Sequence, residues 1–156
     1  MYKSDVQQIN RDKTLLAPFF AKRLQIALDE CHAQGMEIEM FEGFRGEDRQ
    51  DYLYAQGRTR EGKIVTKARG GQSFHQYGIA CDLCFKWGGK WQWNKDDPWD
   101  KVHEIFHRHG FETLSFEKAH VQITSGIKIS KAFTISKERG LLALWSIIES
   151  GCKPLK

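Results

Sequence analysis

The chain has 156 residues, of which 40% are hydrophobic, 12% aromatic and 28% charged, with a formal net charge of +4. This length suffices for one domain with a hydrophobic core, and no apolar run is long enough to span a membrane. The mildly basic balance suits an anionic partner such as a cell wall, a nucleic acid or a membrane surface. No basic stripe stands out, however, so an ordinary solvated surface explains the charge equally well.

The N-terminal segment MYKSDVQQINRDKTLL lacks the apolar centre of a secretory signal, so we expect synthesis in the cytoplasm without a signal peptide. The four cysteines are then expected to be free thiols. Cys81 and Cys84 form a C-x-x-C pair, which can indicate a redox or zinc site. Here the pair lies inside an apolar, strand-like run whose alternation favours two small core residues.

Apolar residues recur at helical spacing over residues 15–34, and Gly35 follows as the expected end of a helix. The stretch MEIEMFEGF (36–44) alternates apolar and acidic residues, which is typical of a half-buried strand. Residues 46–56 predict a short helix. Residues 57–72 are rich in Gly, Lys and Arg and predict a long loop, and loops of that length are often functional.

The remaining expected elements are a strand, a hairpin, a helix, a strand and a last helix, over residues 79–85, 86–93, 96–109, 120–123 and 136–149. Gly88 and Gly89 suit the hairpin turn, and Ser136 suits the N-cap of the last helix. Strands and helices mix without strict alternation. We therefore expect a single α+β domain with a small, mainly antiparallel sheet flanked by helices.

One candidate metal motif is conspicuous. The segment HEIFHRHG (103–110) matches the H-E-x-x-H pattern of helical zinc peptidases. In the longer form of that pattern a third histidine follows three residues after the glycine, where this chain has Thr113. On the expected helix, His103 and especially His107 point away from the apolar stripe. Surface histidines are the simpler interpretation.

A second candidate set is dispersed along the chain: His75, Asp82, Glu117 and His120. A buried aspartate is costly unless it is paired or bound to a metal. Two nitrogens and one oxygen leave an open position on a zinc ion, the pattern of a catalytic site. Glu117 then remains as a carboxylate for general-base work. Spacing alone leaves open a hydrogen-bonded core aspartate with scattered histidines.

The segment SFHQYGIACD (73–82) matches the S-x-H-x-x-G-x-A-x-D signature of the D-alanyl-D-alanine carboxypeptidase-like zinc peptidases. The chain most resembles the branch of bacteriophage L-alanyl-D-glutamate endopeptidases, which are cell-wall-lysing endolysins. The stretches EGFRGEDRQDYLYAQGRT (42–59), GKIVTKARGGQSFHQYG (62–78) and EKAHVQ (117–122) support this resemblance. Together they cover about residues 36–123.

The resemblance implies that three residues bind zinc: His75, Asp82 and His120. It implies that Glu117 is the general base of a zinc metallopeptidase. It also implies that Arg45 reaches the scissile carbonyl or its oxyanion.

Further expectations concern the surroundings of the metal. For Arg45, a structural salt bridge with Glu42 or Asp48 is the open alternative. Ser73 is expected to bind the substrate or to hydrogen-bond near the metal, and Gln50 to support the site. Exposed members of one set of tryptophans are expected to stack on sugar or peptide: Trp87, Trp91, Trp93 and Trp99.

The implied substrate is the stem peptide of peptidoglycan, cut between L-alanine and D-glutamate. We expect a monomer that binds no nucleic acid, does not insert stably into membranes, and acts on the cell wall or periplasm after release through another protein. The expected domain spans residues 1–156, with 124–156 as a C-terminal extension packed on it.

Two alternatives stay open. One is a D,D- or L,D-carboxypeptidase acting on the same peptide. The other is a non-catalytic, zinc-stabilised module that binds cell wall or acts in signalling. Glu117 argues against the second, because a pure binder needs no base beside the metal.

Overall fold

The computed structural model describes residues 6–155. Residues 1–5 and 156 belong to the expected domain, and residues 1–5 to the N-terminal segment considered for a signal sequence; these parts of both predictions lie outside the described residues. In chain order the elements are η1 (Lys13–Leu15), α1 (Pro18–Ala33), β1 (Ile38–Glu42), α2 (Glu47–Ala55), η2 (Phe74–Tyr77), β2 (Ala80–Trp87), β3 (Lys90–Gln92), α3 (Trp99–Arg108), β4 (Glu112–Leu114), β5 (Glu117–Gln122), α4 (Ile129–Arg139) and α5 (Leu141–Ser150).

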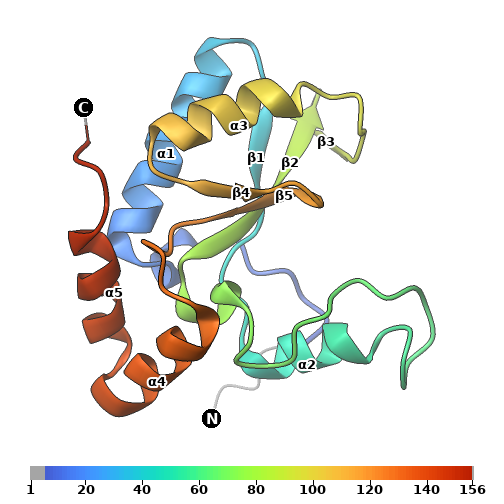
Figure 1. Ribbon diagram of the computed structural model, residues 1–156. Helices are drawn as coiled ribbons and strands as arrows, with labels where there is room; N and C mark the ends of the chain where they lie inside the picture. Colours follow the sequence, from blue (N-terminus) through green and yellow to red (C-terminus); the bar gives the residue numbers. More distant parts are fainter. Residues whose placement is uncertain (1–5, 156) are drawn as a thin grey trace.

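One sheet organises the molecule (Figure 1). Its strands run in the order β1-β2-β5-β4, every neighbouring pair is antiparallel, and β3 pairs with the last residues of β2. Helices surround this sheet (Figure 1). The expected α+β fold with a small antiparallel sheet is therefore confirmed.

The hydrophobic core lies on one face of the sheet. Alternation along β2 sends Cys81, Leu83 and Phe85 into this core, where α1 and α3 also bury their apolar stripes. Asp82 points to the opposite face, where side chains can line a cavity. The period of two residues along β2 thus separates the core from the candidate site.

Two glycine-dependent turns were predicted and are present. Gly35 has φ 80° just after α1, a left-handed conformation that ends helices. Gly88 and Gly89 have φ 59° and 81° between β2 and β3, as a tight type I′ hairpin requires. Within residues 57–72 no helix or strand forms, in agreement with the predicted loop.

The prediction of one last helix over residues 136–149 is wrong. The structure has two helices, α4 and α5, and Ser136 lies inside α4 instead of capping a helix. Gly140 separates them, because its φ of 89° and ψ of 164° interrupt the helical backbone. Apolar spacing continues across this glycine, so periodicity alone did not reveal the break.

Both C-terminal helices pack on the rest of the protein. Ala132 and Ile135 of α4, and Leu144 and Ile148 of α5, are buried in the common core. Trp145 donates its indole N–H to the carbonyl oxygen of Tyr77 at 2.7 Å, next to η2. Among residues 6–155, no helix combines the length and hydrophobicity needed to cross a membrane.

The sequence analysis also missed β4. Its three residues are all half-buried and show no apolar alternation, so no strand signal was visible. Pairing with β4 begins β5 at Glu117, three residues before the predicted strand at 120–123. This hairpin places Glu117 and His120 on one strand.

Candidate metal centre

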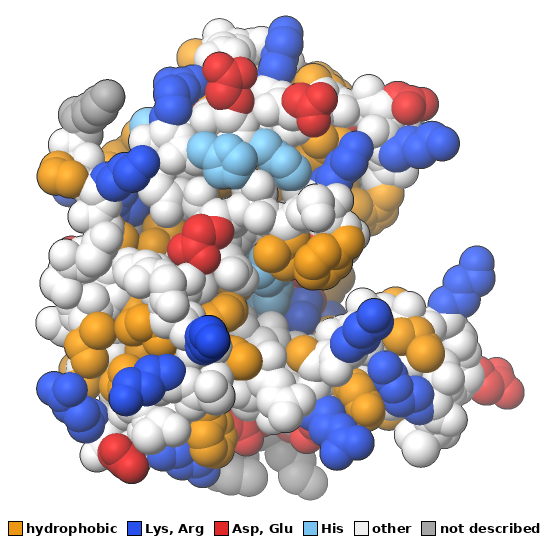
Figure 2. Space-filling model, in the orientation of Figure 1, with side chains coloured by type: hydrophobic (Ala, Val, Ile, Leu, Met, Phe, Trp, Pro, Cys, Tyr) orange, Lys and Arg blue, Asp and Glu red, His pale blue; other side chains and the backbone are white. Residues whose placement is uncertain are grey.

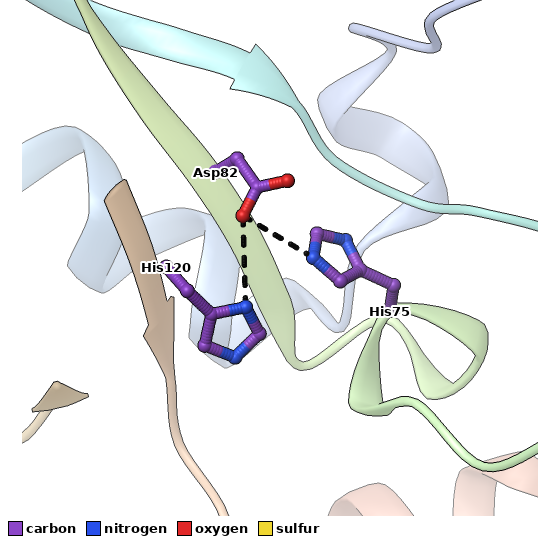
Figure 3. A group of neighbouring side chains, drawn as sticks. All are labelled: His75, Asp82 and His120. Carbon is purple, nitrogen blue, oxygen red and sulfur yellow. Dashed lines mark ion pairs between the residues drawn. The ribbon is translucent and has the colours of Figure 1, made fainter. Parts of the chain in front are cut away.

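His75, Asp82 and His120 converge from three separate elements (Figure 3). One potential ligand atom from each lies within 4.8 Å of the others. The Asp82 Oδ1 atom is 3.5 Å from His75 Nε2 and 3.6 Å from His120 Nδ1. Across residues 6–155, this is the one cluster of three or more His, Cys, Asp or Glu side chains spaced to hold a metal ion.

Local structure explains this convergence. Asp82 and His120 are direct partners in the antiparallel β2–β5 pair, so their side chains share one face of the sheet. His75 lies in η2, whose first turn is capped by the Ser73 hydroxyl. Gly78 then adopts a left-handed conformation, with φ 69°, and turns the chain from η2 toward β2.

Hydrogen bonds orient both imidazoles. His75 Nδ1 lies 2.8 Å from the carbonyl oxygen of Gly43, which can only accept, so His75 Nε2 keeps its lone pair toward Asp82. His120 Nε2 lies 2.8 Å from Gln122 Oε1, and Gln122 in turn donates to Glu112 at 3.4 Å. Metal-binding histidines commonly donate their other N–H group in this manner. Both free nitrogens therefore face the same point.

The carboxylate of Asp82 tests whether a metal fits. Its Oδ2 atom accepts a hydrogen bond from Arg45 at 3.1 Å. Its Oδ1 atom is buried and has no hydrogen-bond partner among the described residues, since both imidazole nitrogens are too distant. A buried oxygen left in this state is costly. Two histidine nitrogens and this oxygen form a donor set that fits zinc with an open position.

The electrostatics of the three residues are coupled. Burial alone would raise the pKa of Asp82, but His75, His120 and Arg45 outweigh it and hold this pKa well below its usual range. Burial alone would lower the pKa of His120, but its contact with Asp82 outweighs burial and raises it. A proton and a metal ion compete for the same His120 nitrogen, so the raised pKa opposes metal binding as the pH falls.

Arg45 is buried in an ionic network beside this cluster. Its Nε atom donates to Glu42 Oε1 at 3.0 Å, its second terminal nitrogen contacts the same oxygen, and Gln50 accepts at 3.1 Å. Arg49 donates to the other Glu42 oxygen at 2.5 Å. The salt bridge with Glu42, kept open above, is thus present, and Arg45 also holds Asp82 in place. Its contact with a scissile carbonyl stays a prediction.

A cavity of about 500 Å³ opens onto the cluster. Its walls come from β1, α2, β2, β5, the 57–72 loop and residues next to β1, α2 and β3. They consist of Phe41, Glu42, Arg45, Arg49, Leu53, Gln56, Val65, Thr66, Asp82, Trp93, Glu117 and Ala119. Figure 2 shows a hollow between the β4–β5 hairpin and α2, with histidine and basic side chains visible at its base. Glu117 is exposed and shares the cavity with Asp82, although its role as a base stays a prediction.

The structure gives Ser73 and Gln50 definite places. The Ser73 hydroxyl accepts the backbone N–H of His75 at 3.3 Å, so it helps position a candidate ligand; its predicted contact with substrate is untested. Gln50 is fully buried and donates to the carbonyl oxygen of Ala68 at 2.8 Å. It also accepts from Gln76 at 3.2 Å, which links the 57–72 loop to the site.

The helical H-E-x-x-H segment forms no comparable cluster among the described residues. His103 Nε2 lies 2.7 Å from the carbonyl oxygen of Lys118. His107 Nε2 lies 2.7 Å from the hydroxyl of Thr113, the residue at the position of the missing third histidine. All four cysteines, which lie within residues 6–155, are free, and the C-x-x-C pair is buried as predicted.

Sequence reasoning missed two supporting residues, Gln122 and Glu112. Gln122 belongs to the EKAHVQ stretch and lies two residues after His120, so strand alternation places both on one face. That spacing was a usable signal for Gln122. Glu112 had none, because its contact depends on β4, where it pairs directly with Gln122.

A family model described as VanY, D-alanyl-D-alanine carboxypeptidase, matches residues 13–129. Peptidoglycan L-alanyl-D-glutamate endopeptidase CwlK of Bacillus subtilis (strain 168) is 41% identical over 88 residues, which are 51% of this chain and 53% of CwlK. The match thus spans about half the length of this relative.

Two solved structures share the fold. The LdcB LD-carboxypeptidase has a TM-score of 0.57 at 19% identity, covering 90% of this chain and 71% of its own. VanYB in complex with D-alanine-D-alanine has a TM-score of 0.55 at 19% identity, covering 86% of this chain and 83% of its own. At this identity the likeness concerns the fold alone.

Proposed function

The chain belongs to the VanY D-alanyl-D-alanine carboxypeptidase family, and on this premise we propose that it is a zinc-dependent peptidase of the peptidoglycan stem peptide. The observation that carries the proposal is the convergence of His75 and His120 on the unpartnered oxygen of Asp82, a residue that lines one cavity together with Glu117. We propose the L-alanyl–D-glutamate bond as the one cleaved, because the chain is 41% identical to CwlK over their shared segment.

In the proposed mechanism, zinc held by His75, Asp82 and His120 would lower the pKa of a water molecule and polarise the scissile carbonyl. Glu117 lies in the same cavity as Asp82 and is exposed, so it can take the proton of the attacking water. It then returns this proton to the leaving amine, and the peptide bond is broken with one water consumed.

We assign Arg45 a charge-stabilising role in this mechanism. Its guanidinium lines the cavity and lies beside Asp82. Its bonds to Glu42 and Gln50 hold the charge in one orientation before substrate arrives. A fixed positive charge near the developing oxyanion lowers the barrier without reorganisation during the reaction.

The test is digestion of purified muropeptides by the zinc-loaded protein, with fragments identified by mass. Cleavage at L-alanyl–D-glutamate releases a disaccharide that carries L-alanine and a peptide that begins with D-glutamate. Release of a single terminal D-alanine would instead identify a carboxypeptidase. Binding of muropeptides without any cleavage would identify a non-catalytic module.

We further propose that this cleavage lyses cell walls, as in endolysins of bacteriophages, once another protein has given the enzyme access to the wall. The resemblance stated above supports this step. A suspension of purified cell walls should lose turbidity when the zinc-loaded protein is added. Stable turbidity despite cleavage of soluble muropeptides would contradict lysis.

A further inference from the structure

Trp93 differs from the other tryptophans of the chain. Three of them donate their indole N–H to neighbouring oxygens and so contribute to packing: Trp87 to Asp97, Trp99 to Asn94 and Trp145 to Tyr77. Trp93 is 57% exposed and lines the same cavity as Asp82 and Glu117. An apolar ring exposed beside a candidate active site is a candidate contact for the substrate.

Strand register places Trp93 on the site's face of the sheet. Lys86 pairs directly with Trp91, and Lys86 lies on the same face of β2 as Asp82, four residues away. Trp93, two residues after Trp91, shares this face. Continuing the register past the end of β3 sets Trp93 beside Cys84, so its offset from Asp82 measured along β2 is two residues, about 7 Å.

The ring of Phe41 supports Trp93. Phe41 of β1 packs edge-on against Trp93, with ring centroids 4.9 Å apart and an interplanar angle of 80°. Phe41 packs in the same way on Trp91, at 5.2 Å and 84°, and the guanidinium of Arg11 lies 4.8 Å from the Trp91 ring centroid. The indole of Trp93 is therefore a pre-organised platform, and binding to it costs little conformational entropy.

The chemistry of the substrate indicates which of its groups binds to the Trp93 indole. In peptidoglycan, L-alanine is joined through a lactyl group to the pyranose ring of muramic acid. The L-alanyl residue and the lactyl group each add about 3.5 Å, so the sugar begins about 7 Å from the scissile carbonyl. This length matches the offset of Trp93 from Asp82. A pyranose presents a flat C–H face, which packs well on an indole.

A neighbouring cavity suits the peptide half of the substrate. This cavity of about 530 Å³ shares Val65, Thr66 and Glu117 with the first one and adds Lys67 and the 84% exposed Phe116. The ammonium group of Lys67 can attract the carboxylates of the stem beyond the cleaved bond. One cavity thus offers an aromatic ring for the sugar, and the other offers a cation for the carboxylates of the peptide.

Resting on the proposed function, we propose that Trp93 binds the muramic acid ring by stacking and thereby sets the orientation in which the substrate lies in the cleft. The test compares two substrates cut by the zinc-loaded enzyme: a disaccharide tripeptide, and the same tripeptide acetylated on L-alanine in place of the glycan. Trp93→Ala should raise KM about tenfold more for the first than for the second, because stacking occurs away from the reacting atoms.

Two further variants sharpen the test. Trp93→Phe should recover most of the preference for the glycan-bearing substrate, since a flat ring remains. Phe133→Ala removes another exposed ring, 42% exposed on α4 and outside this cavity, and should change neither KM. An equal loss on both substrates in Trp93→Ala would overturn the glycan assignment while leaving the peptidase intact. Failure of the unmodified enzyme to cut either substrate would overturn the proposed function as well.

Discussion

The chain contains two groups of histidines whose sequence pattern could indicate a zinc site, and their hydrogen-bonding environments in the structure differ. On α3, His103 and His107 have their Nε2 atoms engaged by the carbonyl of Lys118 and the hydroxyl of Thr113. In the dispersed group, hydrogen bonds occupy the far nitrogen of each imidazole and leave the near nitrogens facing one unpartnered oxygen of Asp82.

The comparison shows what a ligand set needs beyond spacing. Two histidines four residues apart on a helix share a face, but on α3 this face points away from the buried stripe. No third ligand meets them within residues 6–155. The dispersed residues come from three elements, yet the sheet and the turn before it aim them at one point. Tertiary convergence, and not proximity in sequence, distinguishes the candidate metal centre.

Removing one histidine from each group tests the comparison most strongly. His75→Ala should abolish stoichiometric zinc binding and peptidase activity, because a tetrahedral site with two protein ligands is too weak to retain the ion. His107→Ala should leave both unchanged. Zinc per protein after dialysis, measured by atomic absorption, and muropeptide cleavage decide between them. Full zinc in His75→Ala with loss of zinc in His107→Ala would reverse the assignment.

The two glutamates beside these groups offer the next contrast. Glu117→Gln should lower kcat by about 10²–10⁴-fold while zinc stays bound, because the amide cannot accept the proton of the water. Glu104, the glutamate of the helical motif, is exposed on α3, and Glu104→Gln should leave kcat unchanged. Stopped assays on muropeptides with zinc-loaded variants give both values. Near-normal kcat in Glu117→Gln would remove it from the mechanism.

Much of the fold was predictable because local patterns decide it. Alternation defined β2, paired glycines defined the hairpin, and helical spacing defined α1. The break at Gly140 and the strand β4 were not predicted, since the apolar pattern runs through the glycine and β4 is short and only half-buried. Both depend on how segments pack and not on their own residues.

The candidate metal centre was also predictable in part. The family signature brought out His75, Asp82 and His120, and their grouping is now seen. For Arg45 the sequence offered Glu42 or Asp48 as a partner, and the folded backbone shows that Glu42 makes a contact. The support of His120 by Gln122 and Glu112 depends on the β4–β5 pairing, which the sequence did not reveal.

That support gives a smaller, graded prediction. Gln122→Leu removes the acceptor that orients His120 and should weaken zinc affinity by about 10–100-fold without abolishing it. Gln92→Leu changes an exposed glutamine on β3 and serves as the control. Competition with a chromophoric chelator measures both affinities. An unchanged affinity in Gln122→Leu would mean that the β2–β5 pairing alone holds His120 in position.

The last prediction concerns the effect of pH on zinc affinity. The pKa of His120 is raised above its ordinary value because its contact with Asp82 outweighs burial, so at pH values below this raised pKa a proton occupies the atom that zinc needs. The pKa of Asp82 is held well below its usual range, so this carboxylate stays ionised and releases no proton over the same window.

Zinc affinity should therefore fall as pH decreases through the raised pKa of His120, by about tenfold per pH unit for the one proton displaced. The fall continues below that pKa, because each further unit of acidity multiplies the concentration of the competing proton. Chelator competition at several pH values, with the chelator's own protonation corrected, measures the slope. His107→Ala should show the same slope, since its imidazole bonds Thr113 and lies outside the cluster. A slope that disappears in His107→Ala would place the metal on α3.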